Sequence, residues 1–348
     1  MQEMKMKELE NRHRKYLGLD LVQDSWTRLE VCGMVLYHDG EFVRKQINSE
    51  FGTYSECDLC APIPPKYNKG IINKFKEKNG LYFYHSQYSN NSGFYIKIGN
   101  TKSQRTFIED HSHNLEQWLD QWAADTSEQD LADMDDFKTS PTVHQKFKEG
   151  DFFAFKVSRR NWGFGRIIYD IYKRRKLPEF ITGINQGLVN LLGHALIVQV
   201  YHYISPTKDV DMNFLKARMS LPSQPIFHNR FFYGDYLIIG NAPIVDSEIT
   251  PMLSFGKRYE NQKPVASYLQ YGLSYFEGDI LEIDGNYSRE SIGFGLDVNE
   301  TILKECISAC SNDPYWESSL TYTIKDDLRN PANAEVRRKI FNHFGLKL

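Results

Sequence analysis

The sequence predicts an α+β protein with two mainly β domains, each a curved antiparallel sheet with packed helices. Aromatic residues make up 14% of the 348 residues, with 21 Tyr and 22 Phe, and aromatic side chains favour strands. Turn residues separate short apolar runs, which is the pattern of β-hairpins. The length indicates two domains. We expect an N-terminal α+β domain with an acidic helical segment at 1–140 and a β-rich domain at 141–348.

Composition and charge argue against several classes of protein. The formal net charge is −3, whereas general nucleic-acid-binding proteins carry a basic surface, so we expect no nucleic-acid partner. The N-terminus lacks the apolar core of a secretory signal, and no apolar run approaches a membrane span, so we expect no membrane partner. Five Cys are too few for a disulfide scaffold, and we expect reduced thiols in a cytoplasmic protein. The sequence does not indicate the oligomeric state.

Hairpin signals dominate the first hundred residues. Residues 28–47 hold two apolar-rich runs on either side of Asp39-Gly40, and Asp-Gly between such runs is a strong hairpin signal. Residues 80–100 predict another hairpin that turns at 90–93, where Asn, Ser and Gly favour a turn. The start of the first domain is therefore predicted to be an antiparallel sheet.

Two helices are predicted to follow this sheet. The first covers about 114–124, because apolar residues recur there with helical spacing and Asn114 can cap the helix. The second starts at Ser127, with Asp130 three residues further on. Residues 109–136 hold ten Asp or Glu and no Lys or Arg.

A basic stretch at 156–176 contrasts with this acidic segment. One interpretation is that both are solvated faces, or that they pair with each other between domains. The alternative is that the acidic segment docks onto a basic partner, because complementary charge steers encounter.

Recurrent Gly-Asp pairs organise the second domain. Each of them precedes an apolar run, and because Gly accepts positive φ and Asp bonds nearby backbone, each is predicted to start a strand. The run at 152–157 lacks alternation, so both of its faces are predicted to be covered. Helices are predicted at 184–192, after Asn299 and from Pro331. The Gly-Asp pairs are Gly150-Asp151, Gly234-Asp235 and Gly278-Asp279.

Two bare Gly-x-Gly pieces do not make a phosphate site. Gly163-Phe164-Gly165 and Gly293-Phe294-Gly295 lack the full glycine pattern between a strand and a helix. We interpret the first as a bend or a place of close packing.

Cysteine and histidine pairs are the candidate metal ligands. Cys57 and Cys60 with Cys306 and Cys310 could supply four thiolates to zinc, but the second pair lies on a predicted core face, where Cys behaves as a small hydrophobe. Whether the two pairs meet stays open. His111 and His113 lie beside two carboxylates, and we expect them on a solvated surface. No HExxH or GxSxG motif is present, so no catalytic, cofactor-binding or metal residue is assigned, and no cofactor is expected.

The stretch FKEGDFFAFKVSRRNWGFGRIIYDI, residues 147–171, resembles the start of the immunity protein 26 family of bacterial polymorphic toxin systems. Members of that family have a Gly-Asp turn, an apolar strand and then an aromatic-Gly-Arg segment in a second strand. The later YGDYLIIGNAPI, residues 233–244, is similar to another segment of that family. The resemblance covers about 145–280, and residues 172–189 depart from it.

The resemblance implies an intracellular protein that binds and neutralises a cognate toxin and has no enzyme activity. Our hypothesis is that the chain covers the active site of such a toxin, with a basic nuclease as one candidate. A phosphotriesterase-like, metal-dependent hydrolase and a non-enzymatic adaptor protein are the alternatives. The acidic residues predicted to contact the basic toxin are Glu116, Asp120, Asp125, Glu128 and Asp130.

Overall fold

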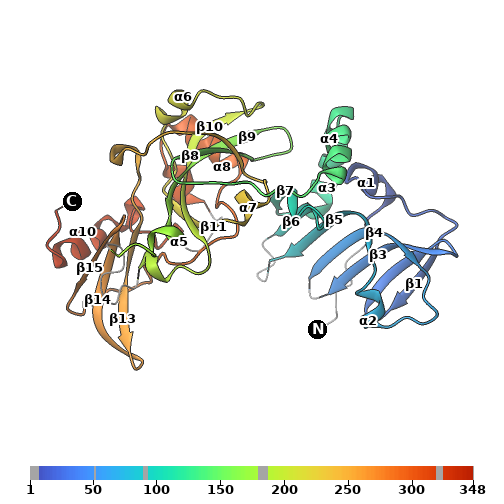
Figure 1. The fold of residues 1–348 in the computed structure, drawn as a ribbon, viewed down its shortest axis with the longest axis horizontal. Coiled ribbons are helices and arrows are strands. Elements are labelled where there is room, and N and C mark those ends of the chain that lie inside the picture. Colours follow the sequence, from blue (N-terminus) through green and yellow to red (C-terminus); the bar gives the residue numbers. More distant parts are fainter. Residues whose placement is uncertain (1–7, 51, 89–92, 179–186, 319–323, 348) are drawn as a thin grey trace. The chain divides into compact units, whose positions relative to one another are not determined.

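The computed structural model describes residues 8–50, 52–88, 93–178, 187–318 and 324–347 (Figure 1). Its internal contacts divide the chain into two compact units, residues 1–144 and 145–348, which are described separately below. Antiparallel sheets with helices packed on them make up both units, so the predicted α+β class is confirmed.

A seven-stranded antiparallel sheet, with the strands in chain order, forms the body of the first unit. The predicted hairpin at Asp39 is confirmed, and the Asp39 carboxylate accepts hydrogen bonds from the backbone N–H groups of Glu41 and Phe42. The hairpin within 80–100 is also confirmed, although its turn at 90–92 lies outside the described residues. The strands are β1 (Thr27–Val31), β2 (Met34–His38), β3 (Phe42–Glu50), β4 (Thr53–Pro62), β5 (Glu77–Gln87), β6 (Phe94–Asn100) and β7 (Arg105–Ser112).

The first apolar run of 28–47 is two strands, so its interpretation as one side of a hairpin is wrong. A tight turn at Cys32-Gly33 separates β1 from β2, and both residues have positive φ, 53° and 78°. Cys rarely adopts this backbone region, which is why the sequence does not reveal the turn.

Helices cover the two faces of this sheet unequally. α1 (Asn11–Tyr16), α3 (Leu115–Asp125) and α4 (Glu128–Thr139) enclose the main apolar cluster, which includes Phe83. α2 (Lys69–Ile72) covers a smaller cluster with Leu36, on the opposite face. The predicted caps are confirmed: Asn114 accepts a hydrogen bond from the Gln117 N–H, and Ser127 forms a capping box with Asp130.

The second unit holds a five-stranded and a three-stranded antiparallel sheet. The larger has the order β11-β10-β9-β8-β12, and the smaller has the order β13-β14-β15. These strands are β8 (Asp151–Lys156), β9 (Trp162–Asp170), β10 (Ala195–Ser205), β11 (Gln224–Phe227), β12 (Leu237–Asn241), β13 (Leu253–Glu260), β14 (Lys263–Tyr271) and β15 (Ser274–Gly278).

Strand β8 is buried on both faces, as predicted. Phe153 and Phe155 pack into a cluster that includes α8, whereas Phe152 and Ala154 pack into one that includes α6. The helices of this unit are α5 (Ile171–Arg174), α6 (Met212–Lys216), α7 (Asn229–Phe232), α8 (Glu300–Ala309), α9 (Asp313–Glu317), α10 (Ala334–His343) and the 3₁₀ turns η1 (Leu188–Asn190), η2 (Asp246–Glu248) and η4 (Pro331–Asn333).

Two of the three Gly-Asp predictions are confirmed. Gly150-Asp151 opens β8, and Gly234-Asp235 shortly precedes β12. The third is wrong, because Gly278 ends β15 and no strand follows it. Leu281 and Ile283 pack instead into the apolar cluster that contains α10. Burial against a helix therefore replaces strand pairing in this segment.

The predicted helix at 184–192 is also wrong over its described part. Residues 188–190 form a single 3₁₀ turn, and 184–186 lie outside the described residues. Leu188 and Leu191 are both buried, and the Leu188 N–H donates to the Gln270 side chain. This tertiary contact overrides the local helical pattern. The helices expected after Asn299 and from Pro331 are confirmed as α8 and as η4 leading into α10.

The glycines of β9 allow the rings of β8 to lie directly on the neighbouring strand. A Cβ atom at Gly165 would stand 2.4 Å from Phe153 Cζ and 2.7 Å from the Gln199 carbonyl oxygen. A Cβ atom at Gly163 would stand 2.7 Å from Phe155 Cζ. The interpretation of this motif as a place of close packing is confirmed.

We expect Gly165→Ala to lower the free energy of unfolding by about 2 kcal/mol, because an added methyl group overpacks a core that cannot shift. Urea unfolding of the full chain measures the change. Gly278→Ala is the matched control, because its Cβ atom would meet its nearest neighbours at an ordinary 3.5 Å. Equal stability of the two variants would contradict this account of the β8–β9 packing.

Candidate functional site

The two acidic helices, α3 and α4, carry most of their carboxylates on the side away from the sheet. Leu119, Trp122, Met134 and Phe137 point into the apolar cluster of the first unit. The exposed carboxylates of the two helices are named here the acidic surface. The only Lys or Arg on α3 and α4 is Lys138, which pairs with Asp135. The acidic surface consists of Glu116, Asp125, Glu128, Asp133, Asp135 and Asp136.

The five predicted contact residues differ in their surroundings. Glu116, Asp125 and Glu128 are exposed, so a partner can reach them. Asp120 is exposed but already pairs with α1, and Asp130 is only 5% exposed because its carboxylate belongs to the Ser127 capping box. A partner contact at these five positions stays a prediction, and the last two also have a part in holding the helices.

The ion pairs of Asp120 attach α1 to α3. Its carboxylate lies 2.8 Å from Arg12 Nη1 and 2.9 Å from His13 Nε2. The hydrogen bond from His13 lowers the pKa of Asp120 and outweighs a small opposing effect of burial. The Asp120 side chain therefore stays ionised and already paired, and contributes less free negative charge than its neighbours.

A buried charge network fixes the N-terminal segment to the sheet. Lys45 Nζ lies 2.8 Å from Glu56 and 2.6 Å from Asp58, and the three side chains are fully buried. Arg14 pairs with Glu56 at 2.7 Å, and Tyr54 donates to the same carboxylate. Breaking such a network would leave an uncompensated buried charge, which is costly.

The two carboxylates of this network titrate differently. Burial opposes the charge on Glu56, but Lys45 and Arg14 together lower the pKa of Glu56. Asp58 has only Lys45 and a backbone N–H donor from Asp20 against burial, so burial wins and raises its pKa. Of the two carboxylates, Glu56 is therefore the one whose ionised form the network favours.

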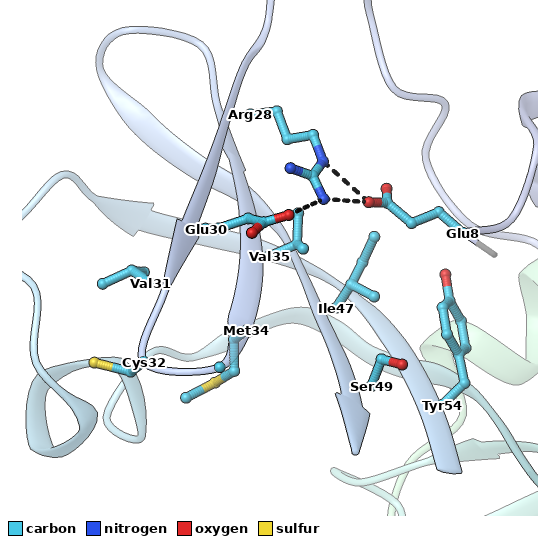
Figure 2. A pocket seen from close by; sticks show the side chains of 11 residues that line it. Glu8, Arg28, Glu30, Val31, Cys32, Met34, Val35, Ile47, Ser49 and Tyr54 are labelled. Atoms are coloured by element: carbon cyan, nitrogen blue, oxygen red, sulfur yellow. Dashed lines mark hydrogen bonds and ion pairs between the residues drawn. The ribbon is translucent and has the colours of Figure 1, made fainter. Parts of the chain in front are cut away.

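A small pocket lies beside the β1–β2 turn (Figure 2). Arg28 reaches across it to Glu8 and Glu30, at 2.8 Å from each, so the charged groups of the pocket already pair with one another. Ile47 and Tyr54 line the pocket too. Its volume of about 250 Å³ lies below the usual range of ligand sites.

A wider groove of about 430 Å³ lies on the face of the sheet opposite α3 and α4. Tyr82 and Tyr84 project there, and the Tyr82 ring lies over Gly99, where a Cβ atom would stand 2.6 Å from its hydroxyl. Asn48 bonds Ser55 across the strands at 3.2 Å. The groove is aromatic and polar, a composition that can accept side chains of a protein partner.

The candidate metal ligands do not form a cluster. Cys60 is exposed, Cys57 is partly buried and Cys306 is buried in the core that includes α8, as its helical face predicted. The same prediction is wrong for Cys310, which is exposed because it caps α8 in the left-handed conformation and leaves the helical face. His111 ends up in β7, hydrogen-bonded to the Tyr88 hydroxyl. Within the described ranges, no group of three or more His, Cys, Asp or Glu could hold a metal ion.

Arg166 is the central polar residue of the second unit. Its side chain is fully buried, pairs with Glu248 and donates to the carbonyl oxygens of Ala242 and Pro243 at 2.8 and 2.7 Å. The guanidinium also lies over the Phe152 ring, 4.6 Å from its centroid. Arg166 thus connects β9 to the segment after β12, and it is the Arg that follows Gly-Phe-Gly in the sequence.

A second polar group forms where β9 meets α5. Asp170 is 1% exposed, and its carboxylate lies 3.0 Å from His194 Nε2 and 3.0 Å from Lys173 Nζ. Burial opposes its charge, but these two donors lower the pKa of Asp170 to about 2. His194 stacks on His228 with ring centroids 4.6 Å apart. This arrangement positions the His194 imidazole beside a buried carboxylate.

Comparison with known proteins adds one match. Residues 148–264, about a third of the chain, match the family model described as Immunity protein 26. The predicted resemblance to that family is confirmed. No curated protein and no solved structure matches the chain.

The Immunity protein 26 segment contains the two polar groups described above, around Arg166 and Asp170. It begins just before β8 and ends at the start of β14, so it includes Arg166 and Asp170 with their partners Glu248 and His194. The family description indicates an immunity protein of a toxin system. Across the part of the chain that the structure covers, no helix is long and apolar enough to cross a membrane.

Sequence reasoning missed the buried charges of both units. Lys45, Glu56 and Asp58 alternate with other residues on β3 and β4, which is also the pattern of a solvated sheet face. Arg166 was grouped with the exposed basic stretch, although it lies in an apolar run. An apolar context around a single Arg is the signal that could have indicated burial.

We expect His85 to make the first unit sensitive to acid. His85 is 2% exposed and stacked on Tyr54, and burial lowers its pKa to about 4. Between pH 6.5 and 4 the unfolded chain takes up a proton that the folded chain does not, so stability falls by up to about 3 kcal/mol as the pH falls. His85→Phe should remove this part of the loss in urea unfolding. Equal losses in wild type and variant would contradict the assignment.

Proposed function

We propose that this chain is an immunity protein that binds a cognate toxin and neutralises it by covering its active site. The match of residues 148–264 to Immunity protein 26 is the observation that carries the proposal. The matched segment forms a closely packed sheet, with β8 buried on both faces and Arg166 connecting its strands. A rigid sheet loses little conformational entropy when it binds, which favours inhibition by steric cover.

The proposed action takes place inside the cell that makes the toxin and needs no reaction centre. A toxin is neutralised once its active site is covered, so affinity and shape decide the outcome. Exposed aromatic and Arg side chains contribute most to such interfaces. The groove with Tyr82 and Tyr84 in the first unit has the composition of a protein-binding surface, so it is a second candidate contact for the toxin.

The acidic surface supports a basic toxin, such as a nuclease, as the partner. Its six carboxylates lie on two consecutive helices, and the segment 109–136 contains no Lys or Arg. A basic protein would be steered toward such a surface and would associate faster at low salt. Asp120 and Asp130 support the surface by holding α3 and α4 in place.

Co-expression with the product of the neighbouring toxin gene tests the proposed function. We expect the chain to restore growth of cells that make the toxin, and to purify with the toxin as a stable complex. Failure of the purified chain to bind this toxin would remove the proposal. If growth is restored but no complex forms, inhibition by covering the active site of the toxin is contradicted.

A triple variant tests the acidic surface. We expect Glu116→Gln, Asp125→Asn and Glu128→Gln together to slow association with the toxin about tenfold at low salt and to reduce the salt dependence of the rate, because steering is lost. Stopped-flow or surface-based kinetics measures both. Glu260→Gln, Glu282→Gln and Glu335→Gln, which neutralise three exposed carboxylates of the second unit, form the matched control. Equal rates for both triple variants would assign the toxin contact elsewhere.

A further inference from the structure

Two large apolar side chains are conspicuously exposed at one end of the five-stranded sheet. Leu192 is 71% exposed and Phe294 is 73% exposed, more than the other exposed large apolar side chains that the described residues include. The Phe294 ring lies 5.0 Å from the ring of Phe227, the last residue of β11, and Leu192 precedes Gly193, where an added Cβ atom would meet the Phe227 ring at 3.0 Å. Leu192 therefore lies near the end of β11 where Phe294 packs on Phe227, and these three residues are named here the apolar patch.

The backbone holds Phe294 in this exposed position. Gly293 forms a bridge with β11, because its N–H donates to the Pro225 carbonyl and its carbonyl accepts from the Phe227 N–H, at 3.1 and 2.8 Å. A Cβ atom at Gly293 would stand 2.9 Å from the Gly295 carbonyl oxygen, so the Gly-Phe-Gly motif makes a tight turn. Phe294 therefore lies at the tip of a turn whose backbone is already ordered.

Leu192 is held outward in a similar way. Arg175, just after α5, donates to the carbonyl oxygens of Leu191 and Gly193 at 2.9 and 2.7 Å. Leu191 is buried and Gly193 has a φ of +60°. The chain between them is thereby fixed on both sides, and the Leu192 side chain faces solvent.

Cations border the apolar patch. The Arg175 guanidinium lies 5.1 Å from the Tyr172 ring centroid, and Lys176 Nζ lies 3.7 Å from it. Two carboxylates of this part of the described chain already have partners, since Asp170 pairs with His194 and Lys173, and Glu149 pairs with Arg174. Among the described residues, neither Arg175 nor Lys176 forms an ion pair with a carboxylate.

We propose that this patch and its cationic border, here the docking patch, bind a segment of the partner protein that carries a large apolar side chain next to acidic residues. A rigid apolar centre bordered by charge has the anatomy of an interface hot spot, and the border selects a negative segment by charge. The proposal rests on the proposed function and assigns the partner as the cognate toxin. The docking patch consists of Leu192, Phe227, Phe294, Arg175 and Lys176.

The patch lies on different elements from the acidic surface, so the two surfaces make separate contacts. The apolar centre distinguishes it from a nucleic-acid site, which would need more cations to follow a phosphate backbone. Most of the patch belongs to the Immunity protein 26 segment, and Phe294 is added from outside it through the bridge to β11.

The test compares two double variants of the full chain. Leu192→Ser with Phe294→Ser removes the apolar centre, and because both side chains are mostly exposed, the thermal midpoint should stay unchanged. Tyr259→Ser with Val265→Ser, which are 58% and 40% exposed at the β13–β14 hairpin, is the matched control. With the inactivated product of the neighbouring toxin gene as the probe, we expect affinity to fall about 30-fold or more for the first pair and about twofold or less for the control.

Lys176→Glu tests the charged border. We expect this variant to associate with the same probe about tenfold more slowly at low salt, and the difference to disappear at high salt. If the association rates of wild type and variant depend equally on salt, the partner segment is not acidic as proposed.

The outcomes separate this inference from the proposed function. If the wild-type chain binds the toxin and the Leu192/Phe294 pair binds it equally well, the docking patch is wrong and the immunity function stands. If the wild type does not bind the toxin, the proposed function fails, and the partner assigned here fails with it. Sedimentation that shows self-association of the wild type, lost in this pair, would instead assign the patch to a second copy of the chain. If the wild type binds nucleic acid and the Leu192/Phe294 double variant does not, the assignment of the docking patch to a toxin segment is also wrong.

Discussion

The second unit depends on the contact between the β8 rings and the β9 glycines. Phe153 and Phe155 lie against Gly165 and Gly163 with no space for a Cβ atom, so the two strands and their register fix each other. Beside this apolar contact, the buried Arg166 connects β9 to the chain after β12. A close-packed sheet with buried polar connections of this kind is rigid, and rigidity is what a protein that acts by cover requires.

The first unit obtains its order by a different device. Its sheet encloses Lys45, Glu56 and Asp58, whose mutual pairing is needed because each charge would be costly alone. Such a network stabilises less than an apolar core of similar volume, but it accepts only one arrangement of partners. Tyr54 of the same strand and Arg14 of α1 bind the Glu56 carboxylate, so the network also sets where α1 lies and thereby supports α3 through Asp120.

Local chemistry explains which parts of the fold could be predicted from the sequence. Caps at Asn114 and Ser127 and the turn at Asp39 depend on neighbours in the chain, and they were predicted correctly. Contacts between distant segments decided the rest. The strand expected after Gly278 gave way to packing against α10, and the helix expected before Gly193 gave way to the burial of Leu188. The buried Arg166 needed knowledge of which carbonyl groups would face it.

The same distinction applies to the candidate surfaces. A concentration of carboxylates between 109 and 136 is visible in the sequence, but which of them a partner can reach depends on the fold: Asp130 is used for capping and Asp120 for an ion pair. Phe294 shows the reverse case, because its Gly-Phe-Gly context carried no functional signal until the bridge to β11 fixed it as an exposed side chain. Exposure that the backbone enforces is a stronger indication of binding than exposure in a free loop, since only the side chain, and not the backbone, has to be ordered when a partner arrives.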